Sequence, residues 1–305
     1  MPVATAAPTP NLSPHSVAGM SQIGAYFRNW MPNPKSKTDA SGVVMYDYGG
    51  KIGIQYTPTA IAEAALCDYD RWLVDKDNTL KNSDWAAFMT QIRWLLANQL
   101  PDGRWLFHFQ WGKTPVPWWS GLTDGLAISA LVRAYALTGD PAQLTAITQA
   151  RTTYERDQKT ENGITSPVKV GSKTYYVYEE YPPGYSVGNV LNGWIFALVG
   201  LYEDETYLHD KAATTLLRGP NRGLAALKAL LPYYDTGNWS RYAMQPVTPR
   251  IGTRASRGYH NLVIGQLWFV AKISGDRYFS QVARRWQGYL DKCTAARHCP
   301  PPYRS

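Results

Sequence analysis

The stretch Leu131–Leu144 reads L-V-R-A-Y-A-L-T-G-D-P-A-Q-L, and a similar stretch, L-W-F-V-A-K-I-S-G-D-R-Y-F-S, occupies Leu267–Ser280. Both read as helix, Gly-Asp turn, helix. Two further short turns, at 75–82 and 203–206, complete four helical hairpins at spacings of roughly 60 to 70 residues. We therefore predict a mainly α protein, built as an incomplete (α/α) toroid or barrel of four helical hairpins.

Apolar residues recur at helical spacing from Thr57 onward. Pro58 and Pro141 fit first-turn positions, and Ser83 fits an N-cap. Between the second and third hairpins, an alternating run with Gly171-Ser172 at its turn predicts a small β-hairpin insertion. The predicted helices cover 58–74, 83–100, 123–138, 141–158, 188–202, a broken stretch over 206–231, 259–274 and 276–292.

Three segments follow from this pattern. Residues 1–50 are expected to form a flexible or irregular N-terminal segment, 51–292 the (α/α) barrel domain, and 293–305 a C-terminal tail. No apolar run reaches transmembrane length, and the first 35 residues lack the charged and apolar regions of a signal peptide. Secreted, periplasmic and cytoplasmic locations therefore all stay open.

The net charge favours an anionic partner. The chain has 31 Lys and Arg against 23 Asp and Glu, a net charge of +8, which suits nucleic acid, anionic lipid or an acidic polysaccharide. Its 12 Trp and 21 Tyr exceed the needs of a core, and such rings stack on bases and on sugars. Because no run of Lys or Arg resembles a nucleic-acid-binding stripe, we expect an acidic polysaccharide and no nucleic acid.

The cysteines and histidines do not indicate a metal site. The five histidines are scattered, and the three cysteines lack the spacing of zinc ligands. We expect Cys67 in the core, whereas Cys293 and Cys299 either close a small disulfide loop or stay free thiols. No cofactor is expected.

The segments that lead into the first helix of each hairpin are rich in aromatic residues. They read G-I-Q-Y-T-P before Pro58, P-V-P-W-W-S-G before Thr123, E-E-Y-P-P-G-Y before Gly188, and R-G-Y-H around Tyr259. If these first helices line the barrel, their N-termini meet at one end. Free N–H groups and partial positive charge at that end suit the carboxylate of a ligand.

The triplet Asp235-Thr236-Gly237 resembles the catalytic triplet of aspartic proteases. Such a protease needs two of these triplets in β-rich lobes, because two carboxylates must share one proton. A single triplet after a predicted helix indicates a turn instead, shaped by Asp235 and Gly237. We expect this turn to deliver Tyr242 to the barrel mouth.

Several stretches resemble the C-terminal catalytic domain of the D-glucuronyl C5-epimerases, which convert glucuronic to iduronic acid in heparosan and heparan sulfate. They are W-W-S-G-L-T-D-G-L from Trp118, E-Y-P from Glu180 with V-L-N-G-W-I-F-A-L-V-G-L-Y after it, L-P-Y-Y-D-T-G ending at Gly237, Y-H-N-L-V-I-G-Q-L from Tyr259, and R-R-W-Q-G-Y-L from Arg284. In this order they cover about residues 52–290. The resemblance implies an (α/α) toroid, an isomerase acting on a glucuronate-containing glycosaminoglycan, and a homodimer.

The resemblance also implies site residues. Tyr181, Tyr242 and Tyr259 fall on tyrosines of the family's motifs, and Glu180 falls on the glutamate before the first of them. Tyr242 and Tyr259 are expected in the proton transfer, with Tyr181 and Glu180 orienting or assisting. The expected substrate-binding residues are Trp118, Trp119, Asn192, Arg241, Arg254, Arg257 and His260.

C5 epimerisation accounts for these residue types. The reaction removes the proton at C5, next to the uronate carboxylate, and returns one from the opposite face of the ring. Ionising a tyrosine at pH 7 costs about 4 kcal/mol, because its usual pKa lies near 10. We expect nearby arginines to reduce this cost, namely Arg241, Arg250, Arg254 and Arg257.

Two other functions stay open from the sequence. A uronate polysaccharide lyase of the (α/α) toroid type starts with the same C5 proton abstraction, by a Tyr or a His, and His260 stands beside Tyr259. A non-catalytic module that binds acidic polysaccharide would need only the basic charge and the aromatic loops.

Overall fold

The structure, a computed structural model, describes residues 23–27, 35–183, 185, 187–245, 254–295 and 299. It is mainly helical, as predicted. The helices are α1 (Pro58–Val74), α2 (Asn78–Asn98), α3 (Gly121–Thr138), α4 (Pro141–Thr152), α5 (Leu191–Leu208), α6 (Lys211–Arg218), α7 (Gly223–Leu230), α8 (Arg257–Ser274) and α9 (Arg277–Ala295). The strands are β1 (Ser36–Thr38), β2 (Val44–Asp47), β3 (Ile54–Gln55), β4 (Thr165–Val170), β5 (Lys173–Tyr178), β6 (Gly188–Val190) and β7 (Ala243–Gln245), and η1 (Leu231–Tyr234) is a short 3-10 helix.

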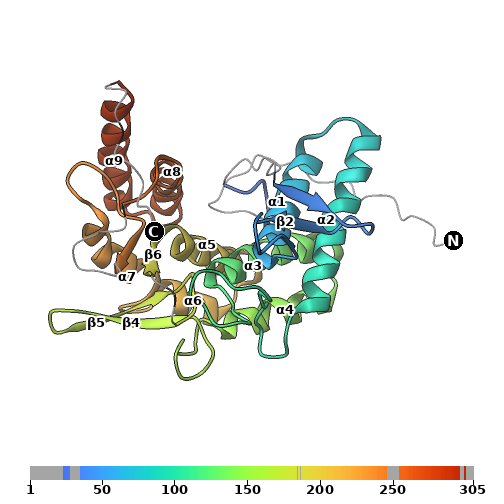
Figure 1. Ribbon diagram of the computed structural model, residues 1–305, viewed down its shortest axis with the longest axis horizontal. Coiled ribbons are helices and arrows are strands. Elements are labelled where there is room, and N and C mark those ends of the chain that lie inside the picture. The colour runs from blue at the N-terminus through green and yellow to red at the C-terminus, as the bar shows by residue number, and fades with distance from the viewer. Residues whose placement is uncertain are drawn as a thin grey trace.

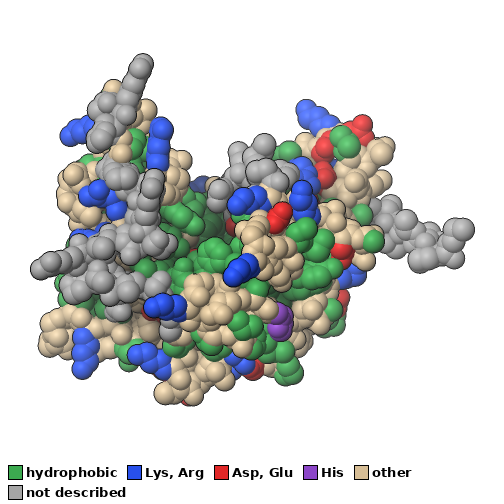
Figure 2. All heavy atoms as spheres, viewed as in Figure 1, with side chains coloured by type: hydrophobic (Ala, Val, Ile, Leu, Met, Phe, Trp, Pro, Cys, Tyr) green, Lys and Arg blue, Asp and Glu red, His purple; other side chains and the backbone are tan. Residues whose placement is uncertain are grey.

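Neighbouring helices pack in pairs, α1 with α2, α3 with α4, α5 with α6, and α8 with α9. The first helices of these pairs also pack against one another in the order α1, α3, α5, α8. In Figure 1, α8 and α9 stand on one side of the molecule and α1 and α2 on the other, with α3 and α5 between them. Figure 2 shows that the surface is hollowed between the two sides and that hydrophobic side chains form the floor of the hollow.

The two Gly-Asp stretches form the predicted turns. Gly139 and Gly275 end α3 and α8 in the left-handed region, with φ of 65° and 69°. A side chain at such a φ is strained, which explains the glycines. The next residue starts the following helix, because the carboxylate of Asp140 accepts the Ala142 N–H at 2.9 Å, and Asp276 accepts the Tyr278 N–H at the same distance.

Helices α3 and α5 approach closely at two glycines. A Cβ on Gly125 would lie 2.5 Å from the carbonyl oxygen of Phe196, and one on Gly200 would lie 2.5 Å from the carbonyl oxygen of Gly125. Farther along, the buried Arg133 guanidinium of α3 donates two hydrogen bonds to the Glu203 carboxylate of α5, at 2.7 and 2.9 Å. The two helices are therefore fixed together in the centre of the fold.

One predicted turn is wrong, because helix α5 continues through it. The turn expected at 203–206 lies inside α5, which runs on to Leu208, and Asp210 caps α6. Glu203 and Asp204 are the first residues of the expected turn. Both are buried and paired instead, Glu203 with Arg133 and Asp204 with an arginine of α4 at 3.1 Å.

Helix α2 also begins earlier than predicted. It starts at Asn78, not near Ser83, because the Asp77 carboxylate accepts hydrogen bonds from two backbone N–H groups of the first turn, at 2.8 and 3.2 Å. Helix α1, in contrast, has the predicted bounds.

Strands β1 and β2 lie in the part of the chain, before residue 51, where an irregular segment was expected. β1, β2 and β3 make an antiparallel sheet in that order, and the Asp39 carboxylate closes the first turn by accepting the N–H of Ser41 and Val43. Gln91 of α2 joins this sheet to the helices, with bonds to Val44 N and Gly42 O at 3.1 and 2.9 Å. The strands are too short to give a clear alternating pattern.

The remaining local predictions concern a hairpin and the cysteines. β4 and β5 pair across Gly171, whose φ is 59°, as predicted for the β-hairpin insertion. Cys293 and Cys299 are joined by a disulfide, and Cys67 is buried in α1. None of the described helices is both long and apolar enough to cross a membrane.

Candidate active site

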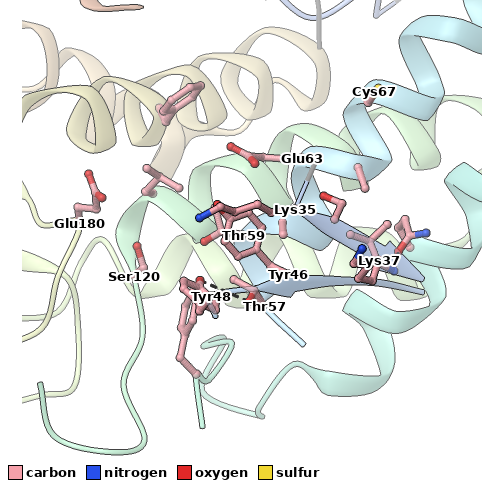
Figure 3. A pocket seen from close by; sticks show the side chains of 18 of the residues that line it. Lys35, Lys37, Tyr46, Tyr48, Thr57, Thr59, Glu63, Cys67, Ser120 and Glu180 are labelled. Carbon is pink, nitrogen blue, oxygen red and sulfur yellow. Dashed lines mark hydrogen bonds between the residues drawn. The ribbon is translucent and has the colours of Figure 1, made fainter. Parts of the chain in front are cut away.

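A cavity of about 1470 Å³ occupies the hollow between the two sides of the molecule. One wall carries Glu180, Tyr181 and Tyr259. The opposite wall, called the β1–α1 wall below, consists of the cavity-lining residues between 35 and 91, which lie on β1, β2, α1 and α2. Figure 3 shows Glu180 at one end of this space and Lys37 at the other.

Four helices begin at the cavity. The residues at or next to their first turns that line it are Thr57 for α1, Ser120 for α3, Asn192 for α5 and Ser256 for α8. The N-termini of the first helices therefore converge, as the aromatic segments indicated. Unpaired N–H groups and partial positive charge at such ends favour a bound anion.

Glu180 is held at the start of α5. Its buried side chain packs against Gly193, where a Cβ would lie 2.7 Å from the Cβ of Glu180 and would overlap the carboxylate. The Asn192 amide lies 3.5 Å from one carboxylate oxygen, and the Tyr242 hydroxyl lies 3.5 Å from the other. Burial raises the pKa of Glu180 to about 7, although hydrogen bonding with Tyr181 and Tyr242 opposes the increase.

Three tyrosines adjoin this carboxyl group. The ring centroids of Tyr242 and Tyr259 are 4.8 Å apart, and hydrogen bonding also links Tyr242 to Tyr181. Tyr181 stacks on Tyr185 at 3.9 Å. Tyr259, in the first turn of α8, is 42% exposed and so can reach a ligand in the cavity.

The tyrosines are not activated in the way that was expected. Burial, followed by the charge of Glu180, raises the pKa of Tyr181 and Tyr242 well above the usual range and that of Tyr259 to about 12. All three are therefore protonated at neutral pH. Within this cluster, Glu180 is the group whose pKa matches neutral pH.

Three of the predicted arginines, Arg241, Arg254 and Arg257, are not among the described residues that line the cavity. Arg241 and Arg254 pair through their backbones, and the exposed Arg257 donates to Thr294 of α9 at 3.2 Å. Arg250 lies outside the described residues. Arg241, Arg254 and Arg257 are close to Tyr242 and Tyr259 in sequence, but this closeness does not bring them to the cavity.

His260 is placed in the core and not in the cavity. Its ring is fully buried, with Nδ1 2.7 Å from Ser240 Oγ and Nε2 3.0 Å from the carbonyl oxygen of Trp286. The ring also stacks on Trp239 at 3.8 Å. Burial lowers the pKa of His260 to about 4. The residue follows Tyr259 in a helix, where consecutive side chains point in different directions.

Of the two predicted tryptophans, Trp118 lines the cavity and Trp119 does not. Trp118 lines the cavity, stacks on Phe107 at 3.8 Å and donates to the carbonyl oxygen of Phe109. Trp119 donates to Gly163 O at 2.8 Å, and the Arg104 guanidinium lies over its ring. The structure thus brings Trp118 to the site and leaves Trp119 behind it.

The Asp-Thr-Gly segment is a turn, as predicted. Asp235 accepts the Gly237 N–H at 2.8 Å, and Gly237 has a φ of 86°. The same carboxylate accepts bonds from Arg285 and Trp286 of α9, at 2.8 and 2.9 Å, so it anchors the last hairpin. The backbone then continues to Tyr242, whose carbonyl oxygen accepts the N–H of Leu191 at 3.0 Å.

The sequence interpretation missed the β1–α1 wall. It adds two tyrosines, Tyr46 and Tyr48, the carboxylate of Glu63, and two lysines, Lys35 and Lys37. A signal was present in V-V-M-Y-D-Y at 43–48, a short run of β-branched and aromatic residues before the glycine-rich G-G-K-I-G.

Comparison with known proteins identifies the family of this chain. Residues 100–288 match the family described as D-glucuronyl C5-epimerase C-terminus. The chain belongs to this D-glucuronyl C5-epimerase family. Glu180 and the three tyrosines lie within the matched residues, whereas the β1–α1 wall lies outside them.

Two relatives of this epimerase-family chain differ in extent. A D-glucuronyl C5-epimerase of Caenorhabditis elegans is 30% identical over 223 residues, which are 67% of this chain and 35% of that protein. An uncharacterized protein of Methanocaldococcus jannaschii is 26% identical over 285 residues, which are 86% of this chain and 87% of that protein. The chain thus spans about a third of the length of the worm epimerase.

Proposed function

We propose that the protein is a C5-epimerase that converts D-glucuronic acid to L-iduronic acid within a heparosan-like glycosaminoglycan. The observation that carries this proposal is the contact between Glu180 and Tyr242, 3.5 Å from carboxylate to hydroxyl, beside Tyr259 in a large cavity. A carboxyl group with a pKa of about 7 can take up and release a proton at neutral pH.

In the proposed reaction, the C5–H bond breaks and its electrons form an enediolate with the uronate carboxylate. Tyr242 takes the C5 proton and passes its own hydroxyl proton to Glu180, so no free tyrosinate is needed. Tyr259 then donates its hydroxyl proton to C5 from the opposite face, where the enediolate electrons form the new C5–H bond. Glu180 returns its proton through Tyr242 to Tyr259, and Tyr181 orients the group. The converging helix N-termini would stabilise the enediolate charge, which removes the need for the predicted arginines.

We also propose that the helix pairs form an incomplete (α/α) toroid. The packing order α1, α3, α5, α8 supports this architecture, since these helices supply the residues around one cavity. A polysaccharide substrate fits a cavity of this size better than a single sugar would.

NMR in D2O with unsulfated heparosan as substrate tests the function. Deuterium at C5 together with iduronate signals is the expected result. An unsaturated sugar end would indicate a lyase, and binding without exchange would indicate a non-catalytic module; either result overturns the proposal. The burial of His260 removes the feature that favoured a lyase.

A further inference from the structure

Three aromatic rings form a row along the cavity. Tyr46 lies in β2, Tyr48 follows this strand, and Trp111 comes from the loop before α3; all three line the cavity. The ring centroids of Tyr46 and Tyr48 are 4.7 Å apart, and those of Tyr48 and Trp111 are 5.4 Å apart. Figure 3 shows the two tyrosines between Glu180 and Lys37. These three rings, called the aromatic row below, give the cavity a continuous apolar surface.

The aromatic row is held in place by its surroundings. The Tyr48 ring packs on Phe109 with centroids 4.7 Å apart, and its hydroxyl accepts a hydrogen bond from Thr57 at 3.5 Å. Trp111 begins a turn that the buried Thr114 closes, because the Thr114 hydroxyl donates to the carbonyl oxygen of Trp111 at 2.8 Å. Rings that are fixed before binding lose little conformational entropy when a ligand arrives.

Trp111 links the aromatic row to the proposed reacting group. Hydrogen bonding joins Trp111 to Tyr185, and a Cβ on Gly112 would lie 3.2 Å from the Tyr185 ring. Tyr185 stacks on Tyr181 at 3.9 Å, and Tyr181 directly follows Glu180. A polymer that has one sugar at Glu180 and continues towards β2 therefore crosses the aromatic row.

The chemistry of the rings selects the kind of sugar that they can hold. The face of an aromatic ring carries partial negative charge, so it attracts the C–H groups of a sugar and disfavours a carboxylate. The three side chains are half-buried, which leaves part of each ring open to the cavity. Burial raises the pKa of Tyr48, which keeps this ring uncharged at neutral pH. The aromatic row thus suits an uncharged sugar better than a uronate.

We propose that the aromatic row is a stacking subsite for the uncharged amino sugar next to the uronate that Glu180 and Tyr259 hold. The inference rests on the proposed function, because in a heparosan-like polymer an uncharged amino sugar follows each uronate. It adds to that function the neighbouring sugar that the protein recognises. Tyr46 and Tyr48 lie outside the residues that match the family.

The test measures binding apart from turnover. A heparosan hexasaccharide is titrated calorimetrically into the protein carrying Glu180→Gln, with and without Trp111→Ala or Tyr46→Ala. Each change to Ala should weaken binding about five- to twentyfold, as expected when a stacking ring is lost. Trp111→Phe and Tyr46→Phe keep a ring, and they should bind within about threefold of the parent.

A control and a second measurement separate stacking from a general disturbance of the protein. Tyr233→Ala removes a ring that is 50% exposed and does not line the cavity, and it should change affinity by less than about twofold. Because aromatic rings shift nearby protons upfield, NMR of the bound hexasaccharide should show upfield shifts at the C–H protons of an amino sugar, and Trp111→Ala should remove them. Equal affinity of the parent and both Ala variants, or upfield shifts confined to uronate protons, would overturn the subsite.

The result is independent of the proposed reaction. If the unaltered protein exchanges no C5 proton but the Ala variants still lose affinity and the amino-sugar shifts, the epimerase function fails and the subsite stands. If exchange occurs and the Ala variants bind as tightly as their parent, the subsite fails and the epimerase function stands.

Discussion

The carboxyl group of Glu180 rests directly on the backbone of Gly193, with no room for a side chain between them. Gly193 lies in the first turn of α5, and its N–H bonds to Glu180. The helix thus fixes the acid by contact and by hydrogen bonding at once.

Changing Gly193 to Ala should therefore displace Glu180. We expect C5 exchange to fall at least about tenfold, together with a loss of about 1–3 kcal/mol in the free energy of unfolding, as for other overpacked sites. NMR measures the rate of C5 exchange, and urea unfolding measures the loss of stability. Gly265→Ala in α8 is the matched control, because a Cβ there meets nothing within 4 Å, and it should stabilise by about 0.4–1 kcal/mol. A G193A protein with full exchange would contradict the account of Glu180.

Changing Glu180 to Gln should abolish exchange, because the amide cannot accept the proton from Tyr242. In the unaltered protein, exchange should rise with pH as Glu180 loses its proton around pH 7. A rate profile between pH 5 and 8 in D2O, corrected for the isotope shift in pH reading, measures this. A flat profile would show that a different group is the proton acceptor.

The same substitution should change the pH dependence of stability. The pKa of Glu180 is about 7 in the folded protein, against a usual value of 4.5. The favourable proton binding is fully present below pH 4.5 and is lost as pH rises through 7. Gln keeps the neutral form, so E180Q should gain on the order of 3 kcal/mol relative to the unaltered protein between these pH values. Urea unfolding of E180Q and of the unaltered protein at each pH measures the difference in their free energy of unfolding. The contributions of the other carboxyl groups are common to both proteins and cancel.

Changing Tyr259 to Phe should reduce exchange by at least about a hundredfold while leaving the fold intact. The residue is 42% exposed, lines the cavity and belongs to the proposed proton-transfer set. Tyr233→Phe is the control, since Tyr233 is 50% exposed and does not line the cavity. Full exchange in Y259F would remove this residue from the reaction.

Changing His260 to Gln should affect stability and not the reaction. Two ring nitrogens have partners in the core, and losing them should cost about 1–3 kcal/mol. The lowered pKa of about 4 also means that His260 stabilises the protein above its usual pKa of 6.5, and that this contribution is lost as pH falls through 4. H260Q should be less sensitive to acid over this interval. The rate of C5 exchange per folded molecule should be the same in H260Q and in the unaltered protein, measured at a temperature where both proteins are folded.

Local signals predicted much of the fold. Pro58 and a regular apolar period gave the bounds of α1, and the Gly-Asp turns located two hairpins. The end of α5 was not predicted, because Glu203 and Asp204 read as turn residues unless their distant partners Arg133 and Arg151 are known. A local sequence pattern does not show which distant residues will form ion pairs.

The site residues likewise fall into those that local motifs predicted and those that depend on the tertiary structure. Glu180, Tyr181 and Tyr259 were predicted from motifs, and the structure brings them to one cavity. The arginines were chosen by sequence proximity, which says little about side-chain direction in a loop or a helix. Tyr46 was missed because it reaches the cavity only from β2, which packs against α1 in the folded protein.

The two walls of the cavity are far apart in the order of synthesis. Lys35 leaves the ribosome early, Glu180 much later, and Tyr259 later still, in a hairpin that Asp235 ties down only after Arg285 and Trp286 have been added. Most of the described helices therefore precede Tyr242 and Tyr259 in the chain, and the cluster around Glu180 is completed late. The cavity is complete only when the last hairpin docks, because this hairpin carries Tyr259.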